Sequence, residues 1–174
     1  MYAAGCIHAL YQPTKYEFLI ALVSPDGLWR FPQSLDGGTV AAAKPKALHI
    51  AVELLANARI DVAIPHMFCL AGMTQYRALL ETLGIAFVGN LPFQMALTAD
   101  KEKTKAVVSA AGVNVPRGEL LVNSLGCQQP TLKLPVVVKP NHSDNSDDVS
   151  LVRQPDDYPA ALDAAFACSP TVLI

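Results

Sequence analysis

A buried strand, a polar loop and a second strand form the segment that most constrains this chain. The first strand is the apolar run Leu134–Pro140, and the second is Val149–Val152. Lys139 stands where the first strand meets the loop. Backbone N–H groups and hydroxyls of such a loop can bind an anion, and a lysine adds a point charge. On this segment alone, a solvated lysine at a strand end is the favoured interpretation.

Two further lysines precede that segment, on a stretch with a helical pattern. Asp100 is suited to cap the start of this helix. Lys101 and Lys105 are four residues apart, so they share a helix face, whereas we expect Glu102 on a different part of the surface. A solvated helix face explains such lysines by itself. Their combination with Lys139 favours an anion-binding site.

The first half of the chain alternates helical and strand-like segments. Helices are expected over residues 1–11, from Pro45 onwards and over 74–83; strands are expected over 17–23, 29–32, 61–64 and 85–88. This alternation favours an α/β domain with a parallel, doubly wound sheet. We place that domain at residues 1–97.

The second half has a different order of elements. The expected order is a helix from Asp100, strands at 119–122, 134–140 and 149–152, a helix from Pro155 and a strand at 171–174. This α-β-β-β-α-β order predicts a small α+β lobe at residues 98–174 with antiparallel strands. The chain starts in a helix and stops in an apolar strand, so both ends are expected to be cut.

Composition excludes several classes of function. Of the 174 residues, 52% are hydrophobic, and the net charge of -2 provides no basic surface for nucleic acid. A signal peptide and an apolar run long enough to cross a membrane are both missing from the sequence. No C-x-x-C spacing joins the four cysteines, which are expected to be reduced and mostly buried, as in a cytoplasmic protein. They are Cys6, Cys69, Cys127 and Cys168.

Six short motifs in order resemble the ATP-grasp ligases, and most closely the D-alanine–D-alanine ligase group. They are Gly84–Asn90, Asp100–Lys105, Ala111–Val113, Leu134–Pro140, Val149–Val152 and Val172–Ile174. Each motif is weak, but six in order are specific, and the resemblance runs from about residue 66 to the last residue. It implies a pre-ATP-grasp domain at 1–97 without its first strand. An ATP-grasp small lobe at 98–174 follows, with the second lobe absent.

The resemblance also implies which residues contact ATP. Lys101 and Lys139 match the lysines that contact the phosphates, whereas Lys105 more closely matches a residue that supports the helix face. Asn145 and Ser146 take the two serine positions of the loop that closes over the phosphates. Their amide and hydroxyl remain able to bind oxygen atoms.

The loop departs from the family pattern at its glycines. Asp144 and Asp148 stand at the first and last glycine positions. At about 4 Å, a carboxylate opposes a phosphate charge by about 1 kcal/mol in water and about 4 kcal/mol near a protein surface. These acids could turn outward or help to hold magnesium, and the sequence leaves both alternatives open.

His66 is the candidate substrate-binding residue. It matches the histidine of the family's H-G-x-x-G-E-D-G segment, whose acidic pair is absent here. A structural, hydrogen-bonding histidine is the simpler interpretation. The missing acids leave open a substrate other than D-alanine.

The function that the resemblance implies is ATP-dependent ligation of a carboxylate to an amine through an acyl phosphate. The implied cofactors are ATP and Mg²⁺. The implied substrate is a small amino acid or peptide, and the implied assembly is a homodimer. The metal ligands of the family follow residue 174, so we assign no metal ligand or catalytic residue and expect this chain alone to be inactive. Two alternatives stay open: a non-catalytic binding module, or an ATP-grasp ligase of another specificity.

Overall fold

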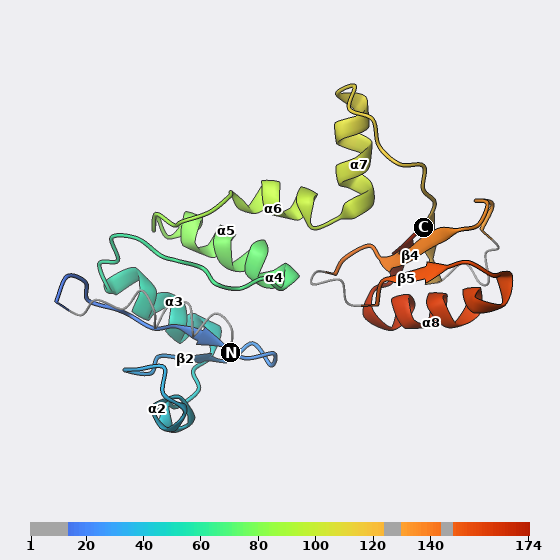
Figure 1. Ribbon diagram of the computed structural model, residues 1–174. Helices are drawn as coiled ribbons and strands as arrows, with labels where there is room; N and C mark the ends of the chain where they lie inside the picture. The colour runs from blue at the N-terminus through green and yellow to red at the C-terminus, as the bar shows by residue number, and fades with distance from the viewer. Residues whose placement is uncertain (1–13, 124–129, 144–147) are drawn as a thin grey trace. The chain divides into compact units, whose positions relative to one another are not determined.

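The computed structural model describes residues 14–123, 130–143 and 148–174 (Figure 1). They divide into two compact units. Within the described residues, the first unit comprises residues 14–68 and 76–89, and the second comprises 69–75 and the chain from residue 90 onwards. The sequence predicts the boundary between the two domains at residue 97.

The first unit is built mainly of helices. A two-stranded antiparallel ribbon joins β1 (Leu22–Val23) to β2 (Trp29–Arg30). The helices are α2 (Gly37–Ala42), α3 (Leu48–Asn57) and α5 (Gln75–Thr82), the last of which begins at the junction of the two units. The expected helix at 1–11 lies outside the described residues.

The expected strands at 61–64 and 85–88 are present only as one parallel bridge. Among the described residues, a parallel bridge joins Ala63 to Phe87, and hydrogen bonds of 2.8 and 2.9 Å tie Ala63 to the neighbouring residues 86 and 88. The chain is therefore α/β, while the doubly wound sheet stays a prediction. The core of this unit is Trp29, Ala51, Leu55 and Ile85.

The second unit contains a four-stranded sheet. Its strands are β3 (Leu120–Val122), β4 (Val136–Pro140), β5 (Ser150–Val152) and β6 (Thr171–Leu173). They lie in the order β3-β6-β4-β5, and each neighbouring pair is antiparallel. The helices are α4 (Leu70–Met73), α6 (Pro92–Thr98), α7 (Lys101–Ala110) and α8 (Tyr158–Cys168), the last preceded by the 3-10 turn η2 (Pro155–Asp157). The expected α-β-β-β-α-β order is confirmed from α7 onwards.

The two faces of this sheet differ in what covers them. Helix α8 packs along one face (Figure 1), where Ala161 and Ala165 contact the core formed by Val136, Val138 and Val172. Successive residues of a strand point to opposite faces. The opposite face therefore carries the remaining residues of β4 and their cross-strand neighbours.

That second face, which we call the open face, combines apolar side chains with one lysine. Val137 is 42% exposed and faces Leu151 of β5, which is 53% exposed. Lys139 faces Leu173 of β6, and Leu173 in turn faces Leu120, which is 40% exposed. Because Val136 and Val138 lie in the core with α8, the alternation along β4 places Lys139 away from α8. In the ranges that the structure describes, no helix is long and apolar enough to cross a bilayer.

Candidate functional site

The start of α7 meets the end of β4, and Asp100 lies at the centre of the contact. Its side chain is the N-cap of α7, because Oδ1 accepts a hydrogen bond of 3.0 Å from the Lys103 N–H. Its Oδ2 forms an ion pair of 2.8 Å with Lys103 Nζ. Burial raises the pKa of Asp100, but the hydrogen bonds from Lys103 and Asn141 outweigh it and hold the pKa well below its usual range. Asp100 is therefore charged at neutral pH.

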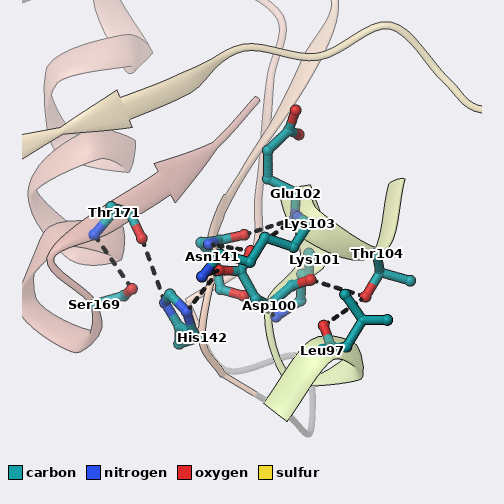
Figure 2. Close-up of polar contacts among 10 residues, drawn as sticks. All are labelled: Leu97, Asp100, Lys101, Glu102, Lys103, Thr104, Asn141, His142, Ser169 and Thr171. Atoms are coloured by element: carbon teal, nitrogen blue, oxygen red, sulfur yellow. Dashed lines mark hydrogen bonds and ion pairs between the residues drawn. The ribbon is translucent and has the colours of Figure 1, made fainter. Parts of the chain in front are cut away.

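Asn141 follows β4 directly and joins it to α7 (Figure 2). Its Nδ2 donates to Asp100 Oδ1 over 2.9 Å, and its Oδ1 accepts from the Glu102 N–H over 3.0 Å. Only 1% of Asn141 is exposed. The amide thus connects two polar groups of the first turn of α7 to the end of the strand.

Lys101 reaches the loop that follows Lys139. Its Nζ donates to the main-chain oxygen of Asn141 over 3.2 Å and to that of Ser143 over 2.6 Å. Lys139 stands two residues before Asn141, on the open face of the sheet, and is half-buried. Within the described part of the chain, no hydrogen bond or ion pair engages the Lys139 amine. The structure therefore brings Lys101 to the segment that carries Lys139.

His142 is a further member of this cluster that sequence reasoning did not single out. Its Nε2 lies 3.2 Å from Asp100 Oδ2, and its Nδ1 lies 3.4 Å from the Thr171 hydroxyl. Figure 2 shows the ring between α7 and β6. The sequence carried no signal for this position or for Asn141, because their partners lie 29 to 42 residues away.

The expectation for Glu102 was wrong. Its Oε2 lies 3.7 Å from Lys105 Nζ, since residues three apart on a helix are neighbours. The Lys105 amine also packs against Gly118, close to the end of β6. These contacts agree with the expected role of Lys105 as a support for the helix face, and they relieve its repulsion with Lys101.

The other predicted site residues belong to the first unit, to the end of the loop before β5, or to the segment outside the described residues. His66 belongs to the first unit, where its Nε2 is buried and has no hydrogen-bond partner among the described residues. Asn145, Ser146 and Asp144 fall in the segment 144–147, outside the described residues. Asp148 is described, and its φ of 54° lies in the left-handed region that glycine adopts most easily. This conformation agrees with a glycine position in the loop.

Two further expectations concern cysteines and metal ligands. Cys69 and Cys168 are exposed, so the expectation of mostly buried thiols is wrong for these two. Each stands at a helix end, Cys69 as the N-cap of α4 and Cys168 as the last residue of α8. Within the described ranges, no group of three or more His, Cys, Asp or Glu side chains could hold a metal ion.

Comparison with known proteins gives a consistent result. No protein-family model matches the chain. A D-alanine–D-alanine ligase from Mycolicibacterium smegmatis is 29% identical over 99% of this chain and 54% of that protein. Among solved structures, the D-alanine–D-alanine ligase from Helicobacter pylori matches with a TM-score of 0.76 at 19% identity, over 98% of this chain and 56% of that one. The VanG D-Ala:D-Ser ligase from Enterococcus faecalis matches with a TM-score of 0.73 at 18% identity, over 98% of this chain and 56% of that one.

The resemblance to the D-alanine–D-alanine ligases therefore extends over the whole of this chain. At these identities the solved structures show a shared fold alone. The chain spans about half the length of the curated relatives that it matches.

Proposed function

We propose that this chain is the ATP-binding part of an ATP-dependent carboxylate–amine ligase of the D-alanine–D-alanine ligase type. In this proposal the first unit is the doubly wound pre-ATP-grasp domain, and the second unit is the small lobe of an ATP-grasp domain. A cytoplasmic location and a homodimer belong to the same proposal. The whole protein would join a carboxylate to an amine through an acyl phosphate.

The open face of the sheet is the observation that carries the proposal. Lys139 stands there two residues from the exposed Val137, which pairs with the exposed Leu151. Its partner on β6 is the buried Leu173, and the exposed Leu120 lies on the next strand, β3. Lys101 is held at the loop that follows the same strand. A nucleotide needs apolar surface for its base and cations for its phosphates, and ligand sites commonly combine these two features. The residues present on this face therefore suit ATP.

Both lysines have the same role in this proposal. The amines of Lys101 and Lys139 would bind phosphate oxygens and offset the negative charge of the triphosphate. Asn145 and Ser146 stay predicted phosphate contacts. ATP would supply the phosphoryl group that activates the carboxylate. We assign no residue to Mg²⁺, because the described residues offer no cluster of metal ligands.

ATP affinity tests this proposal directly. We expect Lys101→Met and Lys139→Met each to weaken MgATP binding by about tenfold or more, since each removes a charge-assisted hydrogen bond. Lys133→Met is the matched control, because Lys133 is exposed and precedes β4 in the same unit. The affinities are measured by isothermal titration. Equal affinities for all three variants and the unmodified chain would refute the proposal.

The substrate side of the proposal needs a separate measurement. In the longest natural protein that contains this chain, ADP release would be measured with D-alanine, D-serine and short peptides as acceptors. This distinguishes a D-alanine ligase from a ligase of another specificity. We propose that His66 contacts this substrate, as its buried Nε2 without a partner among the described residues suggests. His66→Gln should then change the KM for the acceptor and leave the affinity for ATP unchanged. An unchanged KM would remove His66 from the site.

A non-catalytic binding module is the second candidate. Asp148 favours it, because a carboxylate stands where the resemblance implies a glycine beside the phosphates. We expect the 174 residues alone to bind ATP without forming a peptide bond, since they span about half the length of the relatives. The longest natural protein that contains this chain separates the candidates. Acceptor-dependent ADP release supports the ligase, and ATP binding without release supports the binding module.

A further inference from the structure

The end of β4 and the start of α7 are joined by one buried side chain. Asn141 comes directly after β4, two residues beyond Lys139. Its side-chain oxygen caps the Glu102 N–H, which is one of the N–H groups that a helix leaves without an internal partner. Asp100 caps the next of these groups, the Lys103 N–H. The first turn of α7 is thus capped by Asp100, which precedes the helix directly, and by Asn141, which follows β4.

The main chain of Asn141 extends this junction in two directions. Its N–H donates to the Thr171 oxygen of β6 over 3.0 Å, and its oxygen accepts from Lys101 Nζ over 3.2 Å. One residue therefore contacts the neighbouring strand, the first turn of the helix and the amine of Lys101. Its side chain and main chain both act on the position of that lysine.

Asparagine has the chemistry that this junction requires. The position needs an acceptor for the Glu102 N–H and a donor for the Asp100 carboxylate, at the reach of a two-carbon side chain. An ionised aspartate has acceptors only, and it would place a second negative charge against Asp100. A serine hydroxyl can both donate and accept, but its single oxygen on a one-carbon side chain cannot take the places of both amide atoms.

We propose that Asn141 is a positioning residue that sets the amine of Lys101 relative to Lys139 for the phosphates of ATP. This inference rests on the proposed function. Asn141 does not need to touch ATP in this role. It acts through Lys101, because it holds the helix turn and the loop oxygen that together place the lysine.

The test is a cycle of variants with MgATP affinity as the readout. We expect Asn141→Asp to weaken MgATP binding by about tenfold or more near pH 8, and Asn141→Ser to weaken it less. In a Lys101→Met background, neither substitution should weaken binding further. A residue with only a general structural role would lower the affinity equally in both backgrounds, which would overturn the proposal.

The pH profile gives a second, independent readout. Two carboxylates in contact share a proton, so lowering the pH from about 8 to about 5 should restore a donor at position 141 of Asn141→Asp. The MgATP affinity of Asn141→Asp, divided by that of the unmodified chain at the same pH, should then rise towards one. His142 and Lys103 also contact Asp100. Both are present in the variant and in the unmodified chain, so the ratio at each pH removes their own effect on the affinity. A constant ratio across this range would contradict the proposal.

Two controls make the outcomes distinct. Asn114→Asp adds the same charge at an exposed position of the second unit and should leave ATP affinity unchanged. Asn141→Ser adds no charge, so it keeps the test valid if Asn141→Asp does not fold near pH 8. If Lys101→Met and Lys139→Met both leave MgATP affinity unchanged, the proposed function fails. If Lys101→Met alone leaves it unchanged, the role of Asn141 fails and the proposed function rests on Lys139. If it weakens binding while both Asn141 variants do not, only the role of Asn141 fails.

Discussion

His142 Nε2 lies 3.2 Å from Asp100 Oδ2, although 42 residues separate the two in the chain. The contact joins the loop after β4 to the N-cap of α7. Asp100 also pairs with Lys103 and accepts from Asn141, and it is 5% exposed. One buried carboxylate therefore holds three groups, two of them from the loop after β4. Its ionisation links the stability of the second unit to pH.

Acid should destabilise the protein through Asp100. Its folded-state pKa is depressed below the value near 3.9 of an unfolded chain. The stability that this carboxylate contributes is therefore present above about pH 4 and is lost as the pH falls through the folded-state pKa. Asp100→Asn should lower the free energy of unfolding at pH 7 and make it depend less on pH below about 4. Urea unfolding across this range measures both effects.

Asp163→Asn is the control for the loss of one carboxylate, because Asp163 is exposed on α8. It should leave the acid dependence as it is in the unmodified chain. An Asp100→Asn variant with the same acid dependence as this control would contradict the assignment to Asp100.

Gly118 should not tolerate a side chain. A Cβ at this position would lie 2.7 Å from the main-chain oxygen of Ile174 and would also meet Lys105 Nζ. The lysine can move, but the oxygen cannot easily do so, because it accepts a hydrogen bond from the Glu119 N–H. Gly118→Ala should destabilise the protein by about 1–3 kcal/mol, the usual range for overpacking. Thermal unfolding measures the loss.

The same substitution in a Lys105→Ala background separates the two contacts. Removing the lysine should recover only part of the loss, since the clash with the Ile174 oxygen remains. Full recovery would show that the lysine alone makes the position tight.

A glycine at position 148 should help the binding of ATP and have little net effect on the stability of the fold. Asp148 has a φ of 54°, where glycine is favoured over a residue with a Cβ. Asp148→Gly also removes the hydrogen bond that the Asp148 carboxylate accepts from the Cys168 thiol. These two effects oppose each other, so we expect a change of less than about 1 kcal/mol in the free energy of unfolding. Removal of the negative charge should also tighten MgATP binding. Urea unfolding and isothermal titration measure the two effects separately.

Asp148→Asn divides these effects, because it removes the charge and keeps a side chain at the same φ. It should tighten MgATP binding with little change in stability. If neither variant changes the affinity for MgATP, the Asp148 carboxylate does not face the phosphates.

Alkaline pH should destabilise the protein through Tyr158. Burial raises the pKa of Tyr158 to about 12, and Glu119 adds to the shift. The folded state therefore favours the neutral phenol, so stability is retained below about pH 10 and is lost as the pH rises towards 12. Tyr158→Phe should make unfolding less dependent on pH in this range. The phenol oxygen has no hydrogen-bond partner among the described residues, so the substitution should not destabilise the protein at pH 7. A loss of more than about 1 kcal/mol at pH 7 would indicate a missed partner.

Local signals predicted much of the second unit. Asp100 is the N-cap of α7, as expected, because a side-chain cap needs only residues within one turn. The apolar runs around Val138 and Val172 became buried strands. Helix α6 was not among the expected helices, although its first residue is Pro92 and proline is favoured at the first position of a helix.

The cluster around Lys101 needed the tertiary structure. The sequence by itself determined the strands of the second unit, the Asp100 cap and the two candidate lysines, because periodicity and capping act over a few residues. Only the folded chain decided that Asn141 caps Glu102 from 39 residues away and that His142 contacts Asp100. Such contacts depend on how strands and helices pack around the shared core, which no short segment encodes. The sheet likewise decided the face of Lys139, because its neighbour β6 comes from the end of the chain.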